Sequence, residues 1–259
     1  MKALKSSFEG NIVEYYDDFF LDKGKLEKET QFILNTLLQE QQQIRRVLDV
    51  GSGTGYHDEM LSAKFEHIYG IDISADMVEY AKKKHSAPQN EFEVADIRSW
   101  DEINEKYDAV ISLSHVIGDQ TDNESFDSYL KNINRKLRVG GVFLYNFYNA
   151  PALFFNGLKP RHVKKSVKNH EISRISNATL NPDCNCLKLD YYYIIQNAED
   201  SDSFEIHENM RYFTMMELEY AMRVNGFDDI RFFKWMDTKK LSGNDWNGGC
   251  IARKTKLAD

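Results

Sequence analysis

Residues 47–57, VLDVGSGTGYH, run from a short apolar stretch with one acid into a turn that contains three glycines. The apolar part is typical of a buried strand, and the residues around Tyr56 to Lys64 have a helical pattern. Because glycine has no Cβ, the backbone N–H groups of such a turn can point toward a ligand that approaches closely. The stretch therefore predicts a strand, a glycine turn and a helix that together form a binding site.

Strands and helices alternate on both sides of this turn. The strand candidates are the ranges 46–50, 67–73, 91–97, 107–113 and 139–147, with helices around 26–42, 75–85 and 126–137. This alternation predicts a parallel sheet covered on both faces. After residue 149, three strand-like runs follow without helices between them, SVKNHEISRIS, CLKLDYYYIIQN and FEIHENMRYF, and they predict an antiparallel β insertion.

The C-terminal part returns to the first pattern. TMMELEYAMRVNGF predicts a helix with Thr214 as N-cap, Glu217 in a capping box and Gly226 as the left-handed terminator. DDIRFFKW and GGCIARKT then predict two closing strands. We therefore expect an α/β fold with a doubly wound, mostly parallel sheet of seven strands and an antiparallel β insertion.

The composition of the chain limits the kinds of partner that we expect it to bind. The net charge of −8 disfavours nucleic acid and anionic membrane surfaces, which attract basic proteins. We expect a cytoplasmic protein, because no apolar stretch has the length of a signal peptide core or a membrane span. The three cysteines, Cys184, Cys186 and Cys250, lack further ligands at zinc-site spacing, so we expect reduced thiols and no metal site.

The glycine spacing points to one kind of cofactor. A dinucleotide-binding turn needs a third glycine where this chain has Tyr56, whereas the spacing here is G-x-G-x-G at Gly51, Gly53 and Gly55. With Asp49 before it, the turn resembles the first motif of class I S-adenosylmethionine-dependent methyltransferases. A carboxylate near the end of a buried strand is costly unless something compensates it, and a bound cation would do so.

Later segments resemble the same family in order. GIDIS places Asp72 where the family has the acid that binds the ribose hydroxyls, and EVADIRSW places Asp96 and the Ile97 amide near the adenine. YDAVISL, LRVGGVFLYN and RYFTMMELEYAMRVNGFDDIRFF resemble the family's later strands and helix. The resemblance implies S-adenosyl-L-methionine as cofactor, a Rossmann-like methyltransferase fold, and a cofactor-binding set of Tyr16, Asp49, Gly51, Ser52, Gly53, Gly55, Asp72, Ile73, Met77, Asp96, Ile97, Ser112 and Ser114.

Two residues are candidates for catalysis. His115 follows the fourth strand, at the sheet edge where doubly wound folds bind ligands, and could act as a base or pack under the cofactor. Tyr15 lies in YYDDFF, which resembles the segment that closes over the cofactor in N-methyltransferases acting on nucleotide-linked amino sugars and on glycine. Aromatic residues before a helix are also common core anchors.

The predicted β insertion is the part of the chain that we expect to select the substrate. We expect residues 1–149 to hold an N-terminal cap helix and the cofactor-binding part of the core, 150–212 a substrate lid or dimer contact, and 213–259 the rest of the core sheet. A basic stretch near its start is either a solvated face or a site for a phosphate on the substrate. Its members are Lys159, Arg161, Lys164, Lys165 and Lys168.

The leading hypothesis is a methyltransferase that acts on a small polar molecule, with the amino group of a sugar or amino acid ahead of oxygen acceptors. The alternatives are an O-methyltransferase on a sugar or a phosphorylated capsule or polysaccharide precursor, an NAD-dependent oxidoreductase, and an inactive cofactor-binding partner subunit. We expect a small-molecule substrate, a monomer or homodimer, and no nucleic acid or membrane partner.

Overall fold

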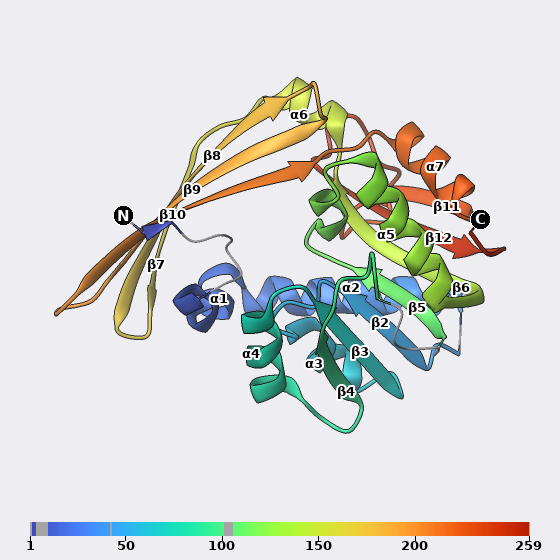
Figure 1. Cartoon of the computed structure of the whole chain (residues 1–259), viewed down its shortest axis with the longest axis horizontal. Helices are drawn as coiled ribbons and strands as arrows, with labels where there is room; N and C mark the ends of the chain where they lie inside the picture. The colour runs from blue at the N-terminus through green and yellow to red at the C-terminus, as the bar shows by residue number, and fades with distance from the viewer. Residues whose placement is uncertain (1, 4–9, 42, 101–105, 259) are drawn as a thin grey trace.

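The computed structural model of the 259-residue chain describes residues 2–3, 10–41, 43–100 and 106–258. It contains two sheets, a central sheet of seven strands and a second sheet that projects to one side (Figure 1). The expected α/β class with an antiparallel insertion is confirmed. Gln42, at the end of the first expected helix, lies outside the described residues.

The central sheet has the order β11-β12-β6-β5-β2-β3-β4. The chain starts this sheet at β2, moves to one side through β3 and β4, and then crosses to the other side of β2 with β5 and β6. The carboxyl edge between β2 and β5 is therefore a topological switch point, where doubly wound sheets bind ligands. The strands are β2 (Arg46–Val50), β3 (His67–Asp72), β4 (Asn90–Val94), β5 (Tyr107–Ser112), β6 (Leu137–Tyr148), β11 (Phe227–Lys234) and β12 (Asn247–Lys254).

Helices cover both faces of this sheet. Apolar residues of α5 and α7 pack on one face, and those of α2 and α3 pack on the other. Only β11 and β12 introduce antiparallel pairing, at the β6 side. The helices are α1 (Val13–Phe20), α2 (Lys23–Glu40), α3 (Tyr56–Ser62), α4 (Ala75–His85), α5 (Asn123–Lys136), α6 (Ala150–Asn156) and α7 (Met215–Val224), with short 3-10 turns η1 (Gly10–Ile12) and η2 (Val116–Asp119).

The second sheet contains four long antiparallel strands, in the order β10-β9-β8-β7. The sequence predicted three strand-like runs in this region, and that number is wrong, because SVKNHEISRIS folds as a hairpin rather than as one strand. Lys168 turns the chain with a φ of 53°, at a position without the glycine that usually marks such turns. The strands are β7 (Arg161–Val167), β8 (His170–Asn181), β9 (Cys186–Gln196) and β10 (Ser201–Arg211), with the two-residue β1 (Lys2–Ala3) pairing in parallel with β10.

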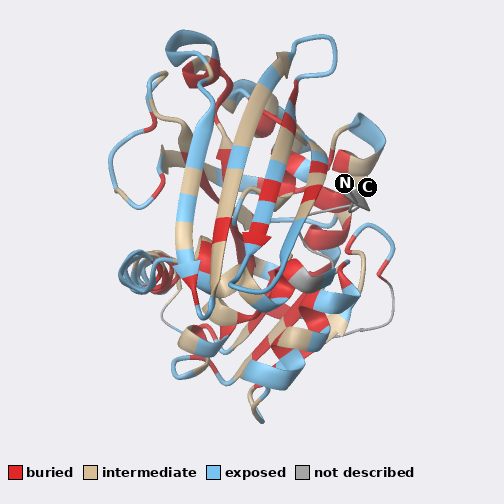
Figure 2. Ribbon diagram, turned by 90° about the vertical axis from the view of Figure 1, so that its left-hand side faces the viewer, coloured by how far each residue is buried: buried red, intermediate tan, exposed pale blue. Residues whose placement is uncertain are grey.

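The two faces of the second sheet differ. Its inner face packs on α1 near the hairpin turns and on α6 near the central sheet. In Figure 2, exposed and buried residues alternate along the long strands, as expected for a sheet with one solvated face. Among the described helices, none is both long and apolar enough to cross a membrane.

Candidate active site

The glycine turn is bonded to the neighbouring strand through its own backbone. The N–H groups of Gly51 and Ser52 donate to the carbonyl oxygen of Ile71, at 2.8 and 3.1 Å. The N–H of Gly53 donates to Asp72 Oδ2 at 2.9 Å. The expectation that such groups point toward a ligand is wrong for these three, because β3 lies beside the turn and accepts them. They are therefore not free to bind a pyrophosphate, the group that dinucleotide-binding turns hold.

The three glycines are required for different reasons. A Cβ at Gly51 would lie 2.5 Å from Val116 Cγ2, and one at Gly55 would lie 2.6 Å from Phe92 Cζ. At Gly53, where φ is +55°, a Cβ would have no neighbour within 4 Å among the residues that the structure describes. Gly53 therefore borders open space, and a ligand can approach the backbone closely there.

Asp72 ends β3 at this edge. Its carboxylate accepts the N–H of Ser74 at 2.8 Å in addition to that of Gly53. Burial raises the pKa of Asp72, and the backbone N–H groups of Ser74, Gly53 and Ile73 act in the opposite direction. A carboxylate has about four acceptor positions, so this fixed group keeps capacity for a further donor, such as a hydroxyl.

Asp49 lies beneath the turn and is paired with a second buried acid that the sequence analysis did not identify. Asp49 and Asp58 are 2% and 0% exposed. Burial, followed by the neighbouring Asp58, raises the pKa of Asp49 well above its usual range. Burial also raises the pKa of Asp58 to about 6. The pair therefore retains a proton that a free aspartate would have lost, and this proton reduces the buried charge, for which the sequence suggested a bound cation.

Asp96 follows β4 and is held by its own neighbour. Arg98 Nε donates to Asp96 Oδ1 at 2.9 Å, and Nη2 donates to Oδ2 at 2.5 Å. These hydrogen bonds lower the pKa of Asp96. Ile97 is 5% exposed, so its side chain belongs to the core. Any contact of Asp96 with an adenine amine would have to share the carboxylate with Arg98.

Other members of the expected cofactor set divide into exposed and buried positions. Ile73 is 68% exposed, and Ser114 is exposed with a φ of 54°. Met77 and Ser112 are 0% exposed, and their membership of the cofactor-binding set stays a prediction. Ser112 Oγ donates to the Val50 carbonyl oxygen at 3.0 Å, which ties β5 to the end of β2.

His115 lies at the end of β5 and stacks on a tyrosine. Its ring is 4.0 Å from that of Tyr148, centroid to centroid, with an interplanar angle of 4°. The His115 N–H donates to Asn146 Oδ1 at 3.0 Å, and φ is 66°, so the backbone holds the ring in a defined position. Burial lowers the pKa of His115 to about 4, although Asn247 and Glu29 act in the opposite direction. His115 is therefore a neutral imidazole at neutral pH.

The two N-terminal tyrosines lie on different sides of α1. The environment of Tyr16 includes Asp72, and burial is the largest cause that raises its pKa. Tyr15 instead contacts the β7–β8 hairpin, with its hydroxyl 3.5 Å from His170 Nε2. Tyr16 thus lies near the cofactor-binding edge, whereas the contacts of Tyr15 are at the far end of the second sheet. A catalytic role of Tyr15 stays a prediction.

Two acids near Tyr148 also belong to the site. Although Asp119 of η2 is exposed, the surrounding protein desolvates its carboxyl group and raises its pKa to about 7, with Glu208 and Asp72 contributing. Glu208 lies on β10 and also acts on the pKa of Tyr148. No local pattern marks Glu208 as a site residue, because its strand is far from η2 along the chain.

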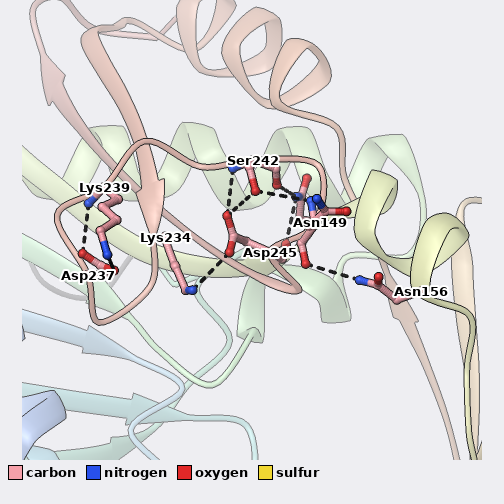
Figure 3. A network of polar contacts seen from close by, with 8 residues as sticks. Asn149, Asn156, Lys234, Asp237, Lys239, Ser242 and Asp245 are labelled. Atoms are coloured by element: carbon pink, nitrogen blue, oxygen red, sulfur yellow. Dashed lines mark hydrogen bonds and ion pairs between the residues drawn. The ribbon is translucent and has the colours of Figure 1, made fainter.

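Asn149 follows β6 and organises the loop behind the site (Figure 3). Its Nδ2 donates to the carbonyl oxygens of Ser242 and Asp245, both at 2.9 Å. Its N–H donates to the Trp246 carbonyl oxygen at 3.0 Å. Asn149 is 0% exposed, so it positions the loop that precedes β12 and does not reach a ligand itself.

Part of the chain is similar to known proteins. Residues 47–141 match the family described as "Methyltransferase domain". A dTDP-3-amino-3,4,6-trideoxy-alpha-D-glucopyranose N,N-dimethyltransferase from Streptomyces venezuelae is 26% identical over 151 residues, 58% of this chain and 62% of the relative. A fatty-acid O-methyltransferase from Mycolicibacterium smegmatis is 29% identical over 119 residues, 44% of this chain and 41% of the relative. The chain thus spans less than two thirds of these relatives' own length.

The likeness in structure extends over nearly the whole chain. The sugar N-methyltransferase KedS8 from Streptoalloteichus superposes with a TM-score of 0.81 at 20% identity, covering 99% of this chain and 96% of that chain. At that identity the likeness shows the fold, including both sheets.

Proposed function

The chain carries a methyltransferase domain on the fold of class I S-adenosylmethionine-dependent methyltransferases, and from this premise we propose that it methylates a nitrogen atom of a small polar molecule. The acceptor in this proposal is the amino group of a sugar or an amino acid. The observation that carries the proposal is the edge formed by Asp72 and the glycine turn, with the neutral His115 just after the end of β5.

S-adenosylmethionine supplies an electrophilic methyl group on a sulfonium sulfur. The edge fits this cofactor because Asp72 is fixed by two backbone N–H groups and Gly53 leaves space beside it. In our proposal Asp72 accepts a ribose hydroxyl, and Ile73 and Ser114 border the adenosine. Tyr16 closes this edge from α1, with Asp72 in its surroundings.

The protonation states support a nitrogen acceptor. A hydroxyl usually needs a base to take its proton during attack, and His115, with a pKa of about 4, is a weak one. An amine needs only to lose one proton beforehand, and Asp119, with a pKa of about 7, is ionised enough at neutral pH to accept it. His115 and Tyr148 then form a flat, desolvated surface that orients the acceptor.

The curated relatives support both the main proposal and its alternative. The Streptomyces venezuelae relative is named for an amino sugar and two N-methyl groups, whereas the Mycolicibacterium smegmatis relative is an O-methyltransferase. Oxygen methylation therefore remains the alternative, on a sugar or a phosphorylated precursor. An oxidoreductase is disfavoured, because the N–H groups of the turn are bonded to Ile71 and Asp72.

The test is a methyl-transfer assay with labelled S-adenosylmethionine against nucleotide-linked amino sugars, amino acids and their hydroxyl analogues lacking the amine. We expect label in amine-bearing acceptors and a mass increase of one or more methyl groups. Transfer only to hydroxyl analogues would contradict the nitrogen proposal. Cofactor binding without transfer to any acceptor would favour an inactive subunit, and thermal protection by NAD alone would favour the oxidoreductase.

Calorimetry with an Asp72→Ala variant tests the cofactor edge independently. Loss of a charge-assisted hydrogen bond, worth about 1.5–3 kcal/mol, should weaken S-adenosylmethionine binding at least tenfold. The matched control is Asp76→Ala, in the first turn of α4, whose carboxylate accepts the N–H of Gly10 instead. Equal affinities of wild type and Asp72→Ala would remove Asp72 from the site.

A further inference from the structure

The β8–β9 hairpin carries two of the three cysteines at its turn. β8 ends at Asn181 and β9 begins at Cys186, and these two residues are paired in the ladder. Cys184 lies in the turn and is exposed, whereas Cys186 is 3% exposed. Cys250, on β12, is buried in the central core. All three are free thiols, so the hairpin presents one accessible thiol and one buried thiol that are separated by a single residue.

The backbone of the turn brings these two thiols together. Asn185, between them, has a φ of 54°, a value at which a non-glycine residue adopts the compact left-handed conformation. Helical geometry of either hand places the Cα atoms on the two sides of such a residue about 5.5 Å apart, which is the usual separation in a disulfide. Cys186 Sγ donates to the carbonyl oxygen of Cys184 at 3.2 Å, so the buried thiol points back toward the exposed residue.

Hydrogen bonds hold the turn in a fixed shape. The N–H of Tyr212, just after β10, donates to the carbonyl oxygen of Asn185 at 2.9 Å. The N–H of Asp183 donates to Asn181 Oδ1 at 3.2 Å. Because both thiols belong to one anchored turn, they meet as intramolecular partners, and a bond between them is favoured over a bond to a second thiol from solution.

The surroundings give the two thiols different roles. Burial, followed by the hydrogen bond to Cys184 and the charge of Cys184, raises the pKa of Cys186 to about 12, and the charge of Arg211 acts in the opposite direction. Arg211 lies opposite Cys186 in the β9–β10 ladder. Attack on a disulfide needs a thiolate that the disulfide can reach, so the exposed Cys184 is the first nucleophile. Once Cys184 carries a sulfur substituent it has no charge, and its contribution to the raised pKa of Cys186 is lost.

We propose that Cys184 and Cys186 form a thiol–disulfide exchange site, which a low-molecular-weight disulfide such as oxidised glutathione converts to an intramolecular disulfide. The Cys184 thiolate attacks one sulfur of the oxidant, whose S–S bond breaks, and one half of the oxidant leaves as a thiolate. Cys186 then loses its proton to water and attacks the Cys184 sulfur, which releases the second half. The two cysteines together lose two protons and two electrons, and the oxidant gains them as two thiols.

The position of the pair makes this oxidation reversible. The new bond would enclose only Asn185, and a disulfide that closes so short a loop gains little stability from chain entropy. Cys184 is exposed, so a reducing thiol can reach its sulfur. Accessible disulfides of this kind are the ones that reductants open readily. The exchange site is independent of the proposed methyl transfer and goes beyond it.

The test is a count of free thiols in the full-length protein after incubation with oxidised glutathione at pH 8. The protein is then unfolded in N-ethylmaleimide and weighed by mass spectrometry. We expect treated wild type to take up one label instead of three, with no glutathione attached and with Cys184 joined to Cys186 in the peptide map. Dithiothreitol should restore three labels.

Three variants separate the steps. Cys186→Ala should keep one glutathione group on Cys184, because the second attack is lost. Cys184→Ser should take up two labels and no glutathione, since both remaining thiols are buried. The matched control Cys250→Ala should form the disulfide as wild type does and take up no label.

Several outcomes would overturn the exchange site. These are three labels on treated wild type, a glutathione group that stays on wild-type Cys184, a disulfide between two copies of the chain, and a bond that includes Cys250. Glutathione on Cys184→Ser would overturn the role of Cys184 as the first nucleophile. If Cys186→Ala fails to fold, the exposed position of Cys184 still decides the result through Cys184→Ser.

Discussion

Asp49 and Asp58 show how one buried pair of residues responds to pH. Both carboxyl groups are almost inaccessible, and no oxygen of Asp58 has a hydrogen-bond donor among the described residues. Two like charges at such a site cannot both be ionised without a large cost, so the pair retains a proton at a pH where a free aspartate has lost it. The pair therefore favours folding at low pH.

The first prediction concerns Asp58→Asn. Because the folded-state pKa of Asp58 is raised to about 6, its contribution to stability is present below the unfolded pKa and lost as pH rises through about 6. At pH 7.5 the variant should be more stable than wild type, on the order of 1–3 kcal/mol, and the difference should shrink toward pH 4. Urea unfolding at the two pH values measures it. Asp183→Asn, in the exposed turn before β9, is the control, and a variant less stable than wild type at pH 7.5 would contradict the shared proton.

Asp119 and His115 differ in the pH at which each accepts a proton. Desolvation of the carboxyl group by the surrounding protein raises the pKa of Asp119 to about 7, whereas burial lowers the pKa of His115 to about 4. Only Asp119 changes its charge near neutral pH. If it accepts the proton of the amine, the ionised form is the active one.

The second prediction is a pH dependence of methyl transfer. The rate at saturating substrate should rise with pH through about 7 in wild type, because Asp119 must be ionised. Asp119→Asn should lower the rate by roughly a hundredfold or more and remove this rise, while His115→Asn should retain it. Rate profiles between pH 5.5 and 9 measure both. An Asp119→Asn profile with the wild-type rise would assign that rise to the substrate amine.

At the scale of elements, hydrogen bonds at the helix ends hold α5 and α7 in place on the core. The capping box of α7 has Thr214 Oγ1 accepting the Glu217 N–H at 3.2 Å, as the sequence predicted, and Gly226 follows with a φ of 81°. The end of α5 is stabilised by a residue that the sequence does not mark. Lys254 Nζ, on β12, donates to the carbonyl oxygens of Asn134 and Leu137 at 2.6 and 2.8 Å.

The third prediction concerns this buried cation. Lys254 is 2% exposed, so Lys254→Met keeps the apolar stem but removes both buried hydrogen bonds to the carbonyl oxygens of Asn134 and Leu137. We expect a loss of about 2 kcal/mol in the free energy of unfolding, measured by urea denaturation. Lys256→Met, at an exposed position two residues later, should change it by less than about 0.5 kcal/mol. A loss that small in Lys254→Met would show that the two hydrogen bonds contribute little.

At the scale of the whole molecule, α1 joins the two sheets. On one side Asp17 Oδ1 accepts a hydrogen bond from Thr54 Oγ1 of the glycine turn at 2.6 Å. On the other side Phe19 packs against Tyr193 of the second sheet, with ring centroids 6.3 Å apart. The glycine turn at the edge of the central sheet is therefore bonded to a helix that also supports the second sheet.

The fourth prediction follows from this position of α1. S-adenosylmethionine should slow amide hydrogen exchange in residues 13–20, because the bound ligand adds contacts to a short helix with few of its own. Residues 215–224 of α7, on the opposite side of the core, should exchange at an unchanged rate. Hydrogen exchange followed by mass spectrometry measures both segments. Equal slowing in both would indicate global stabilisation and would contradict a local closure by α1.

The sequence by itself determined the kinds of elements and the place of the glycine turn at the sheet edge. The glycine spacing, the acid at Asp72 and the capping box at Thr214 are local patterns, and backbone geometry and side-chain periodicity act over only a few residues. These features were predicted without knowledge of contacts. The seven-stranded sheet followed from the alternation of strands and helices.

Only the tertiary structure decided which charges meet. The register of the β7–β8 hairpin distributes the basic stretch over both faces of the second sheet. It also brings Arg174 close to Arg161, although a turn without a glycine separates them along the chain. The fold likewise placed Glu208 of β10 near Asp119 of η2. Burial and pairing energies depend on residues far apart along the chain, so pKa values, ion pairs and the acceptor site are properties of the packed molecule.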